Sequence, residues 1–560
     1  MAAALSTVFL AAAPLERAAP APRAGGHRPG APVPASRHPV AEDPLDLLWN
    51  HRLDFAAGGA PLVTIRLMEG QQEIAFHTTA PARLRARGGG EVRIPPGQTF
   101  RVRGRGALPA AIARYPLLGD ALYADRARLD ATRRLWEGRG IVVRQRMTGG
   151  VYGIAGHVID NRRIVLLAAG DGSAASAHAF AEEALARYGG RTGTYSEIVT
   201  RPSGRLEVLD AAGVQVAEGD ALVSLDVGGR GSFTVHRVEH DVGQAAHGFE
   251  DRTYHGRLLV TIDSSGHLAV VLAVTLEELL RGLVPSELPA GSPREALKAQ
   301  AVTARSNVLA QIGTRHLTDP YVLCSEVHCQ AYRGEAAQAP ATDAAVRATA
   351  GEALFGREDH ALVDAVYSAM CGGHGEDNDA VWPTMPSAGL RGRPDLPPDQ
   401  ARAWQGGLAS EARLRSFLAG APTGWCGRAS GVREDRYRWT RRFSPSDLSA
   451  LAATLGVGRV RGLEVTARGS SGRARALVVT GDAGHGVVEG ELRIRRLLGD
   501  LPSAMFVIDR AGDDLVLHGG GWGHGVGMCQ WGAIGRAEAG QGYQEILRAY
   551  YSGAEVAKIY

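Results

Sequence analysis

The chain of 560 residues has few lysines, few cysteines and no long apolar run. Only Lys298 and Lys558 are lysine, and 62 basic residues are balanced by 59 acidic ones, for a formal net charge of +3. This balance argues against a histone-like protein that binds nucleic acid through concentrated positive charge, so we expect no nucleic-acid partner. No stretch approaches the roughly 20 apolar residues of a membrane-spanning helix, so we expect no internal span.

The length predicts several domains, and the residue patterns change along the chain. We predict a multidomain α+β protein in which β-rich N-terminal modules and a small α/β module precede an α+β domain that carries the chemistry. The expected segments are 1–43 (signal-like segment and disordered linker), 44–106 (β-rich module), 107–190 (small α/β module), 191–257 (β-rich segment) and 258–560 (C-terminal domain with an insertion around 386–440).

Residues 1–13 form a short apolar stretch that ends in small residues, and a Pro/Ala/Arg/Gly-rich segment without hydrophobic periodicity follows. A secretory signal with a disordered linker is one interpretation. A misplaced start or a disordered tail is the other, because no Lys or Arg precedes the apolar stretch. We expect export to the periplasm, the cell wall or the extracellular space, with no further membrane span.

Apolar residues at helical spacing predict a helix from Leu276, and Gly282 and Pro285 are expected to end it. A second helix is predicted from the capping-box residues Ser292 and Glu295 up to about residue 312.

Glu287 then lies between two prolines on a short connection between these helices, beside Val284 and Leu288. Desolvation by such neighbours would raise the pKa of its carboxyl group, as a general acid near neutral pH requires. The alternative is an ordinary solvated loop glutamate.

Cysteine and histidine gather farther along the chain, at His316, Cys324, His328 and Cys329, with Cys371 and His374 beyond them. These side chains are the usual ligands of zinc, although the spacing is not that of a zinc finger. A disulfide, Cys324 with Cys329 or Cys371 with Cys426, is an alternative, and so are buried cysteines that act as small apolar residues.

Residues 518–533 are rich in glycine, which lets the backbone approach a ligand or another strand closely. Trp522 and Trp531 offer flat faces that could stack on sugar rings, and His524 and Gln530 offer hydrogen bonds. Tight turns whose tryptophans fill the core are the alternative. Gly535 to Ala549 reads as a last helix.

Several enzyme classes find no support in the sequence. No G-x-S-x-G elbow of a serine hydrolase, P-loop or dinucleotide fingerprint is present. A zinc peptidase is disfavoured because no His-Glu-x-x-His helix accompanies the candidate ligands.

Five motifs occur in a fixed order along the C-terminal half of the chain. They are residues 284–289 (VPSELP), 297–305 (LKAQAVTAR), 328–332 (HCQAY), 367–374 (YSAMCGGH) and 523–533 (GHGVGMCQWGA). Residues 258–560 thereby resemble the stage II sporulation protein D family, also called the amidase-enhancer family. Ser306-Asn307 and Cys529 depart from the residues common in that family at these places.

The resemblance implies an exported lytic transglycosylase that cleaves peptidoglycan glycan strands, preferentially strands stripped of their stem peptides. It implies Glu287 as the catalytic acid and His316, Cys324 and Cys329 as zinc ligands, with His328 as a possible fourth. The zinc ion would be structural or would shape the groove, and no organic cofactor is expected. The residues that we expect to bind substrate are Ser286, Arg305, Trp522, His524, Gln530 and Trp531.

In this reading Glu287 is a single general acid and base. It would protonate the oxygen between N-acetylmuramic acid and N-acetylglucosamine, and then accept a proton from the 6-hydroxyl that closes a 1,6-anhydro ring. The alternative is a non-catalytic wall-binding protein that enhances an N-acetylmuramoyl-L-alanine amidase, its partner. The β-rich N-terminal half would then bind the partner or the wall. In either case the module at 107–190 would bind wall glycan or act as a spacer.

Overall fold

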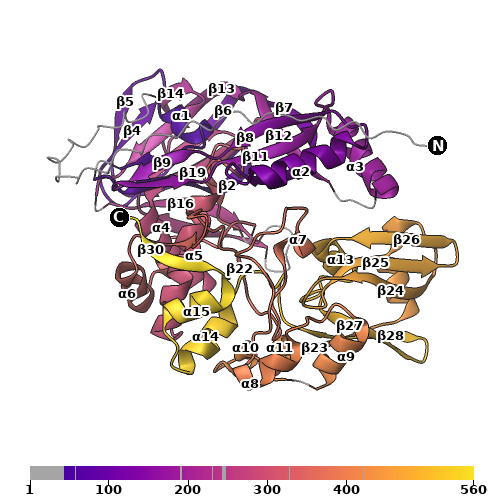
Figure 1. Ribbon diagram of the computed structural model, residues 1–560. Helices are drawn as coiled ribbons and strands as arrows, with labels where there is room; N and C mark the ends of the chain where they lie inside the picture. Colours follow the sequence, from indigo (N-terminus) through magenta and orange to yellow (C-terminus); the bar gives the residue numbers. More distant parts are fainter. Residues whose placement is uncertain are drawn as a thin grey trace, which may run out of the picture. The chain divides into compact units, whose positions relative to one another are not determined.

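The computed structural model describes residues 43–560, except 57, 189–191, 230, 242–246, 327 and 421. The predicted signal-like segment and linker therefore lie, up to residue 42, outside the described residues. The described part is multidomain and α+β, as the sequence predicts (Figure 1). No described helix is both long and apolar enough to cross a membrane.

Two mostly antiparallel sheets form the β-rich part. The first contains, in spatial order, β1 (Asp54–Phe55), β2 (Pro61–Gln71), β19 (Leu268–Thr275), β18 (Arg257–Ile262), β15 (Leu222–Asp226), β4 (Ala82–Ala86) and β5 (Glu91–Ile94), with β20 (Leu323–Cys324) parallel to β2. The second contains β14 (Gln215–Asp220), β13 (Ser203–Leu209), β6 (Phe100–Leu108), β3 (Glu73–Thr78), β16 (Phe233–His240) and β17 (Gly248–Tyr254).

The strand pairing crosses the predicted domain boundaries. β2 pairs with β19, as in Ile65 opposite Leu272, so residues 44–106 and 258–275 share one sheet. Side chains of both sheets, such as Phe76 and Val270, are fully buried in one apolar core. The boundary predicted at residue 258 therefore does not separate two cores, because the strands on its two sides complete each other's sheet.

The small α/β module is an insertion between neighbouring strands of the second sheet. β6 and β13 pair with each other, and the chain between them forms a separate sheet with its own core. The module extends to residue 200 rather than 190, since its edge strand follows the second helix. Its elements are β7 (Ala111–Leu122), α2 (Arg126–Glu137), β8 (Val143–Thr148), β11 (Arg163–Ala168), α3 (Ala174–Tyr188) and β12 (Gly193–Thr200). Residues 151–160 form a hairpin: β9 (Val151–Ile154) and β10 (His157–Asp160) turn at Ala155 and Gly156, which both have positive φ.

Helices surround the long helix α5 (Arg294–Gln311), which is buried along most of its length. The other elements of this layer are α4 (Leu276–Glu287), α6 (Pro340–Ala348), α14 (Gln530–Glu538) and α15 (Tyr543–Tyr550), with the strand pairs β21 (Glu352–Gly356) and β30 (Ala554–Lys558), and β22 (Tyr367–Ser368) and β29 (Met528–Cys529). The single last helix predicted at 535–549 is two helices, because the chain turns at Gly540 with φ of 86°. The helix α1 (Pro44–Trp49) packs its leucines in a smaller core.

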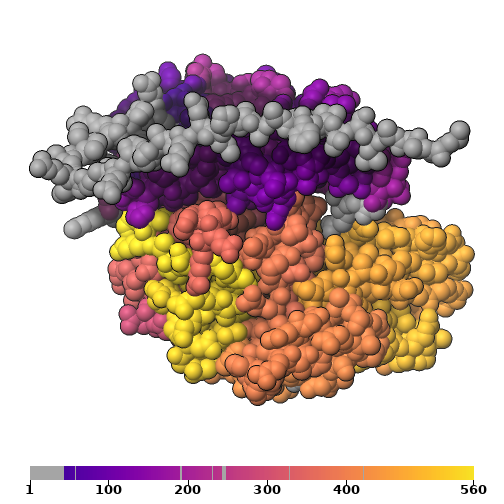
Figure 2. Space-filling model, in the orientation of Figure 1, coloured from indigo at the N-terminus to yellow at the C-terminus, as the bar shows by residue number. Residues whose placement is uncertain are grey.

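Residues 376–527 add two further sheets and several short helices. β23 (Arg438–Phe443), β28 (Asp514–Gly520) and β27 (Phe506–Ala511) form one sheet, and β24 (Val460–Arg468), β25 (Ala474–Gly481) and β26 (Gly484–Glu489) form the other. The helices are α7 (Asn378–Val381), α8 (Pro398–Ala401), α9 (Glu411–Ala419), α10 (Trp425–Arg428), α11 (Glu434–Tyr437), α12 (Pro445–Leu451) and α13 (Glu491–Leu497). The yellow C-terminal helices lie against the orange α10 region in the space-filling view, in agreement with the contacts of α10 with α14 (Figure 2).

Replacing Leu272 by alanine tests the shared core. Leu272 is fully buried on β19, between β18 and β2. We expect Leu272→Ala to lower the free energy of unfolding by about 2–5 kcal/mol, because it leaves a cavity in a close-packed interior. Urea denaturation followed by tryptophan fluorescence measures the loss. Val214→Ala, at a position that is 59% exposed, is the control and should change the value by less than about 0.5 kcal/mol. If Leu272→Ala lowered the free energy of unfolding as little as this control does, the shared core would be contradicted.

Candidate active site

The helix α4 carries Glu287 as its last residue. The prediction that the helix ends before this residue is wrong: Pro285 is accommodated inside the last turn, and Leu288 is the C-cap, with its N–H donating to the Val284 carbonyl. The predicted capping box of α5 does not form either, because Glu295 accepts hydrogen bonds from Lys298 and from the Tyr543 N–H. Glu287 is thus held by a buried helix and not by a free loop.

The Glu287 carboxylate is half-buried, and donors from two distant segments hold it. The Ala331 N–H donates to Oε1 at 2.6 Å, and the Gln530 amide donates to Oε2 at 3.2 Å. The same Gln530 nitrogen lies 3.2 Å from the Glu287 carbonyl oxygen and 3.4 Å from Oε1 of Gln300.

Burial raises the pKa of Glu287 above its ordinary value, although hydrogen bonds with Ala331, Tyr367 and Gln530 partly oppose the shift. Among the described residues, no charged side chain contributes to it. A carboxyl group in such surroundings retains its proton to a higher pH than a solvated glutamate, which is what a general acid requires.

A second row of polar residues holds these donors in place. The Tyr367 hydroxyl donates to Gln330 at 3.1 Å, and the Gln330 amide donates to Asn307 on α5 at 2.9 Å. β22 and β29 run parallel, with Tyr367 opposite Met528, which brings Tyr367 and Gln530 to the same side of the site. The sequence reasoning did not single out Tyr367, Gln330 or Asn307 for this role. Gln330 and Tyr367 belong to the motifs at residues 328–332 and 367–374, which was the available signal, whereas Asn307 lies outside the motifs.

The glycine-rich segment packs as a chain of tight turns. Gly527 has φ of 70°, and a Cβ atom there would lie 1.9 Å from the Val366 carbonyl oxygen, so only glycine fits beside this strand. Gly525 accepts a hydrogen bond at its carbonyl from the Glu376 N–H at 2.8 Å. The expected close approach to a neighbouring strand is therefore present.

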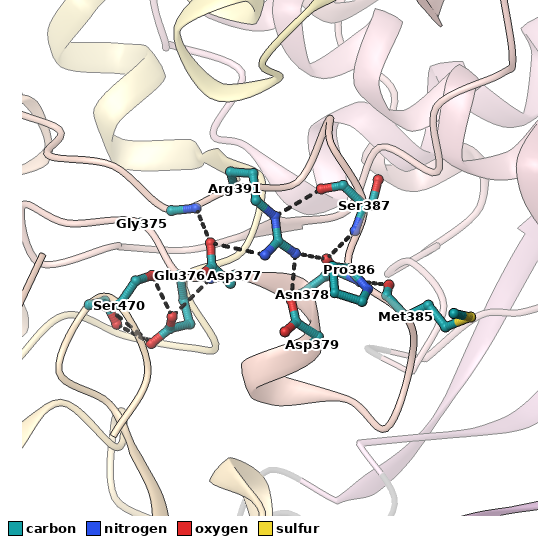
Figure 3. A network of polar contacts seen from close by, with 12 residues as sticks. Gly375, Glu376, Asp377, Asn378, Asp379, Met385, Pro386, Ser387, Arg391 and Ser470 are labelled. Carbon is teal, nitrogen blue, oxygen red and sulfur yellow. Dashed lines mark hydrogen bonds and ion pairs between the residues drawn. The ribbon is translucent and has the colours of Figure 1, made fainter. Parts of the chain in front are cut away.

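The loop from Glu376 to Arg391 adjoins this segment, because Glu376 forms a β-bridge with Val526. Arg391 braces the loop, as Figure 3 shows. Its guanidinium contacts Asp379, Asn378 and the Ser387 carbonyl, and the Asn378 amide donates to the Met385 carbonyl at 2.8 Å. Glu376, which is almost fully buried, accepts from Ser470 at 2.8 Å. This network holds the loop of residues 376–391 in place next to the glycine-rich segment.

The predicted substrate residues fall into two groups. Trp522, His524 and Trp531 are half-buried, and Gln530 contacts Glu287. The Arg436 guanidinium covers one face of Trp522, 3.7 Å from the ring centre.

His524 lies 4.9 Å, ring centre to ring centre, from Trp382. Burial and the positive charges of Arg473 and Arg495 lower the pKa of His524 to about 3, so this imidazole is neutral.

Ser286 and Arg305 do not have the surroundings expected of substrate residues. The Ser286 hydroxyl donates to the Gly282 carbonyl in its own helix at 2.7 Å. The side chain of Arg305 is 0% exposed, and it donates to both carboxylate oxygens of Glu277 at 2.7 and 2.8 Å. The structure corrects the prediction for Arg305: its charge is needed inside the protein to balance Glu277, and it has no free surface for a ligand.

The four predicted metal ligands come together. The ligand atoms of His316, Cys324, His328 and Cys329 all lie within 4.8 Å of one another. Nε2 of His316 is 3.0 Å from Sγ of Cys329, and Nδ1 of His328 is 3.6 Å from Sγ of Cys324. The two thiols are free, so the structure contains no Cys324–Cys329 disulfide.

This donor set fits zinc. Two sulfurs and two imidazole nitrogens at such separations match a tetrahedral ion with bonds of about 2.0–2.3 Å. Nδ1 of His316 lies 2.8 Å from Asp319, the carboxylate–histidine arrangement that orients metal ligands. Hydrogen bonds from Cys329 and His316 lower the pKa of Cys324, which favours the thiolate that a metal binds.

A second cluster consists of Cys371, Asp395, Cys426 and Cys529, all buried. Sγ of Cys371 lies 3.7 Å from Sγ of Cys426, and both thiols are free. The sequence suggested Cys371 as a candidate zinc ligand or as a disulfide partner of Cys426, and it gave no signal for Asp395.

Comparisons with known proteins find matches to two parts of the chain and several relatives. Residues 264–355 match the family model described as "Stage II sporulation protein", and residues 376–527 match a domain of unknown function, which is wider than the insertion predicted at 386–440. The "Amidase enhancer" of Bacillus subtilis is 27% identical over 290 residues, which cover 49% of this chain and 39% of that protein. "Stage II sporulation protein D" of Bacillus subtilis is 26% identical over 309 residues, 51% of this chain and 75% of that protein. An uncharacterized protein of Brachyspira hyodysenteriae is 26% identical over 305 residues, 54% of this chain and 72% of that protein.

The stability of a Glu287→Gln variant tests the surroundings of the carboxyl group. The folded state binds the proton more tightly than the unfolded state, so wild-type stability falls as the pH rises from the ordinary glutamate range through the raised pKa. Glutamine cannot ionise and escapes this loss. We expect the free energy of unfolding of the variant, relative to wild type, to increase between about pH 4 and pH 8. Urea unfolding at a series of pH values measures it, and a difference independent of pH would contradict the account.

Proposed function

Because the chain belongs, through residues 264–355, to the stage II sporulation protein D and amidase-enhancer family, we propose that it is a peptidoglycan lytic transglycosylase. The substrate is the bond between N-acetylmuramic acid and N-acetylglucosamine in glycan strands without stem peptides. The protein works after export, in the periplasm, the cell wall or the extracellular space.

The observation that carries this proposal is the Glu287 carboxyl group. It is half-buried and has a raised pKa, and its partners Ala331, Tyr367 and Gln530 are all neutral. A carboxyl group of this kind is protonated at the start of the reaction and can take a proton back at its end. One such group is sufficient, because no water has to be activated.

In the proposed reaction Glu287 gives up one proton and takes one back. Protonated Glu287 donates its proton to the glycosidic oxygen, and the bond from that oxygen to C1 of the muramic acid breaks with an oxocarbenium-like transition state. The 6-hydroxyl oxygen of the same sugar forms a bond to C1, and its proton passes to the Glu287 carboxylate. The products are a free N-acetylglucosamine end and a 1,6-anhydro-muramic acid.

The hydrogen bonds from Ala331 and Gln530 stabilise Glu287 when its carboxylate is charged. Ala331 and Gln530 donate to different oxygens, so the group keeps one orientation through both proton transfers. Trp531 and the face of Trp522 that Arg436 does not cover, both half-buried beside the glycine-rich turns, would stack against the sugar rings.

We propose that His316, Cys324, His328 and Cys329 hold a zinc ion that fixes this geometry. Cys329 precedes Gln330 and Ala331, so an ion on its sulfur anchors the backbone that binds Glu287. The zinc ion supplies rigidity, and the chemistry remains with the carboxyl group.

A non-catalytic enhancer of a cell-wall amidase is the second candidate. The similarity to the "Amidase enhancer" of Bacillus subtilis favours it. The β-rich part of the chain would then bind the wall or the amidase. Product analysis distinguishes the two functions.

Replacing Glu287 by glutamine tests the enzymatic function. We expect Glu287→Gln to lower the rate of 1,6-anhydro-muramic product formation from denuded glycan strands by about 10²–10⁴-fold, because the general acid is lost. Mass spectrometry of the digest measures the product. Glu335→Gln, a half-exposed glutamate paired with His255, is the control and should keep wild-type activity. Wild-type protein that forms no anhydro product would instead support the enhancer function.

Zinc analysis of Cys324→Ser tests the metal site. We expect the purified variant to contain one zinc ion fewer per chain than wild type, since one of four ligands is replaced by a poorer one. Mass-spectrometric metal analysis measures the ion, and Ser325→Ala beside it is the control. Equal zinc contents in variant and wild type would overturn the assignment, as would a Cys324–Cys329 disulfide in the intact mass.

A further inference from the structure

Three cysteines from distant parts of the chain converge behind the glycine-rich turns. Cys371 follows β22, Cys426 lies on α10 and Cys529 ends β29, and each is at most 2% exposed. Asp395, 3% exposed, joins them, and its Oδ2 is 3.2 Å from Sγ of Cys371. Nothing in the proposed glycan chemistry uses these side chains.

The separations within the cluster match a tetrahedral metal site. The three sulfurs and a carboxylate oxygen all lie within 4.8 Å of one another, and the sulfurs of Cys371 and Cys426 are 3.7 Å apart. Ligands around a tetrahedral zinc ion, with bonds of about 2.0–2.3 Å, stand roughly 3.5–3.8 Å apart. Small movements of side chains suffice to bind an ion.

Backbone N–H groups point at the sulfurs, as they do around thiolates bound to metals. The N–H groups of Cys371 and Gly532 donate to Sγ of Cys529 at 3.1 and 3.3 Å, and the Gly373 N–H donates to Sγ of Cys371 at 3.4 Å. Cys529 is also the N-cap of α14, where the helix dipole favours negative charge. These N–H groups are in place to stabilise the thiolate form of the sulfurs when a metal ion binds.

Asp395 is oriented from outside the cluster. Its Oδ1 accepts from Arg536 at 2.8 and 3.1 Å, and its Oδ2 accepts from the Tyr550 hydroxyl at 3.0 Å. The positive charge of Arg536 balances only the negative charge of the Asp395 carboxylate and not that of any thiolate. Buried thiolates need a further cation, because an uncompensated charge inside a protein is costly.

From these observations we propose that Cys371, Cys426, Cys529 and Asp395 bind a zinc ion, separate from the one at Cys324. A small pocket whose lining includes Cys371, Asp395 and Glu376 adjoins the cluster. The glycine at position 532 leaves the space that the site needs, since a Cβ there would lie 2.6 Å from Oδ2 of Asp395.

The position of this ion gives it a role in the active site. Cys529 directly precedes Gln530, whose amide holds Glu287. The ion therefore fixes one donor of the carboxylate, as the ion at Cys329 fixes the other through Ala331. Both ions act as positioning groups at the two sides of Glu287.

Metal content of the full-length protein, purified under reducing conditions with added zinc, tests the proposal. We expect two zinc ions per chain in wild type, one in Cys426→Ser, one in Cys324→Ser and none in the double variant. Ser430→Ala, close to Cys426, is the control and should keep two. The difference of one ion between wild type and Cys426→Ser is independent of glycan cleavage and of the ion at Cys324, so failure here is distinguishable from failure of the proposed function.

A second measurement, cobalt substitution, does not require the Cys426→Ser variant to fold. Cys324→Ser keeps the second cluster intact, and Co²⁺ bound to it should give intense thiolate-to-cobalt absorption and the visible bands of tetrahedral coordination. Folded Cys324→Ser without these bands overturns the proposal. So does a zinc content that Cys426→Ser leaves unchanged, or a wild-type intact mass that shows a Cys371–Cys426 disulfide.

Discussion

The hydrogen bonds to the Glu287 carboxylate are the interaction on which the site depends. A half-buried carboxyl group without a charged partner must be held by neutral donors, or its ionised form becomes too costly to appear during a reaction. Ala331 and Gln530 supply these donors from segments far apart in the sequence. The fold of residues 276–538 brings the two segments to the end of α4.

Each of these two hydrogen-bond donors lies next in sequence to a cluster of cysteines. Ala331 follows the loop of His316, Cys324 and Cys329, and Gln530 follows Cys529. Short loops rich in glycine are poor positioning elements by themselves, since glycine backbone has many conformations to lose. The two zinc ions that we propose would restrict both segments by linking them to cysteines elsewhere in the fold.

Residues that the sequence pointed to lie together in the structure, although the roles expected of them stay predictions. The Cys/His segment and the family resemblance singled out His316, Cys324, His328 and Cys329, whose ligand atoms are within 4.8 Å of one another. The pairing of β2 with β19 could not be predicted, because strand partners hundreds of residues apart leave no local signal. Arg305 was assigned to substrate since an arginine in a motif invites that reading, whereas its burial depends on Glu277 on another helix. Asp395 was missed for the same reason: only tertiary structure places it beside three cysteines.

Direct titration of the Glu287 carboxyl group tests the central claim, that the fold keeps this acid protonated above its ordinary range. Infrared difference spectra of wild type minus Glu287→Gln isolate the C=O stretch of this one protonated carboxyl group as the pH is raised. The account predicts that the band persists well above about pH 4.3, where a solvated glutamate loses its proton. Loss of the band near that ordinary value would contradict it.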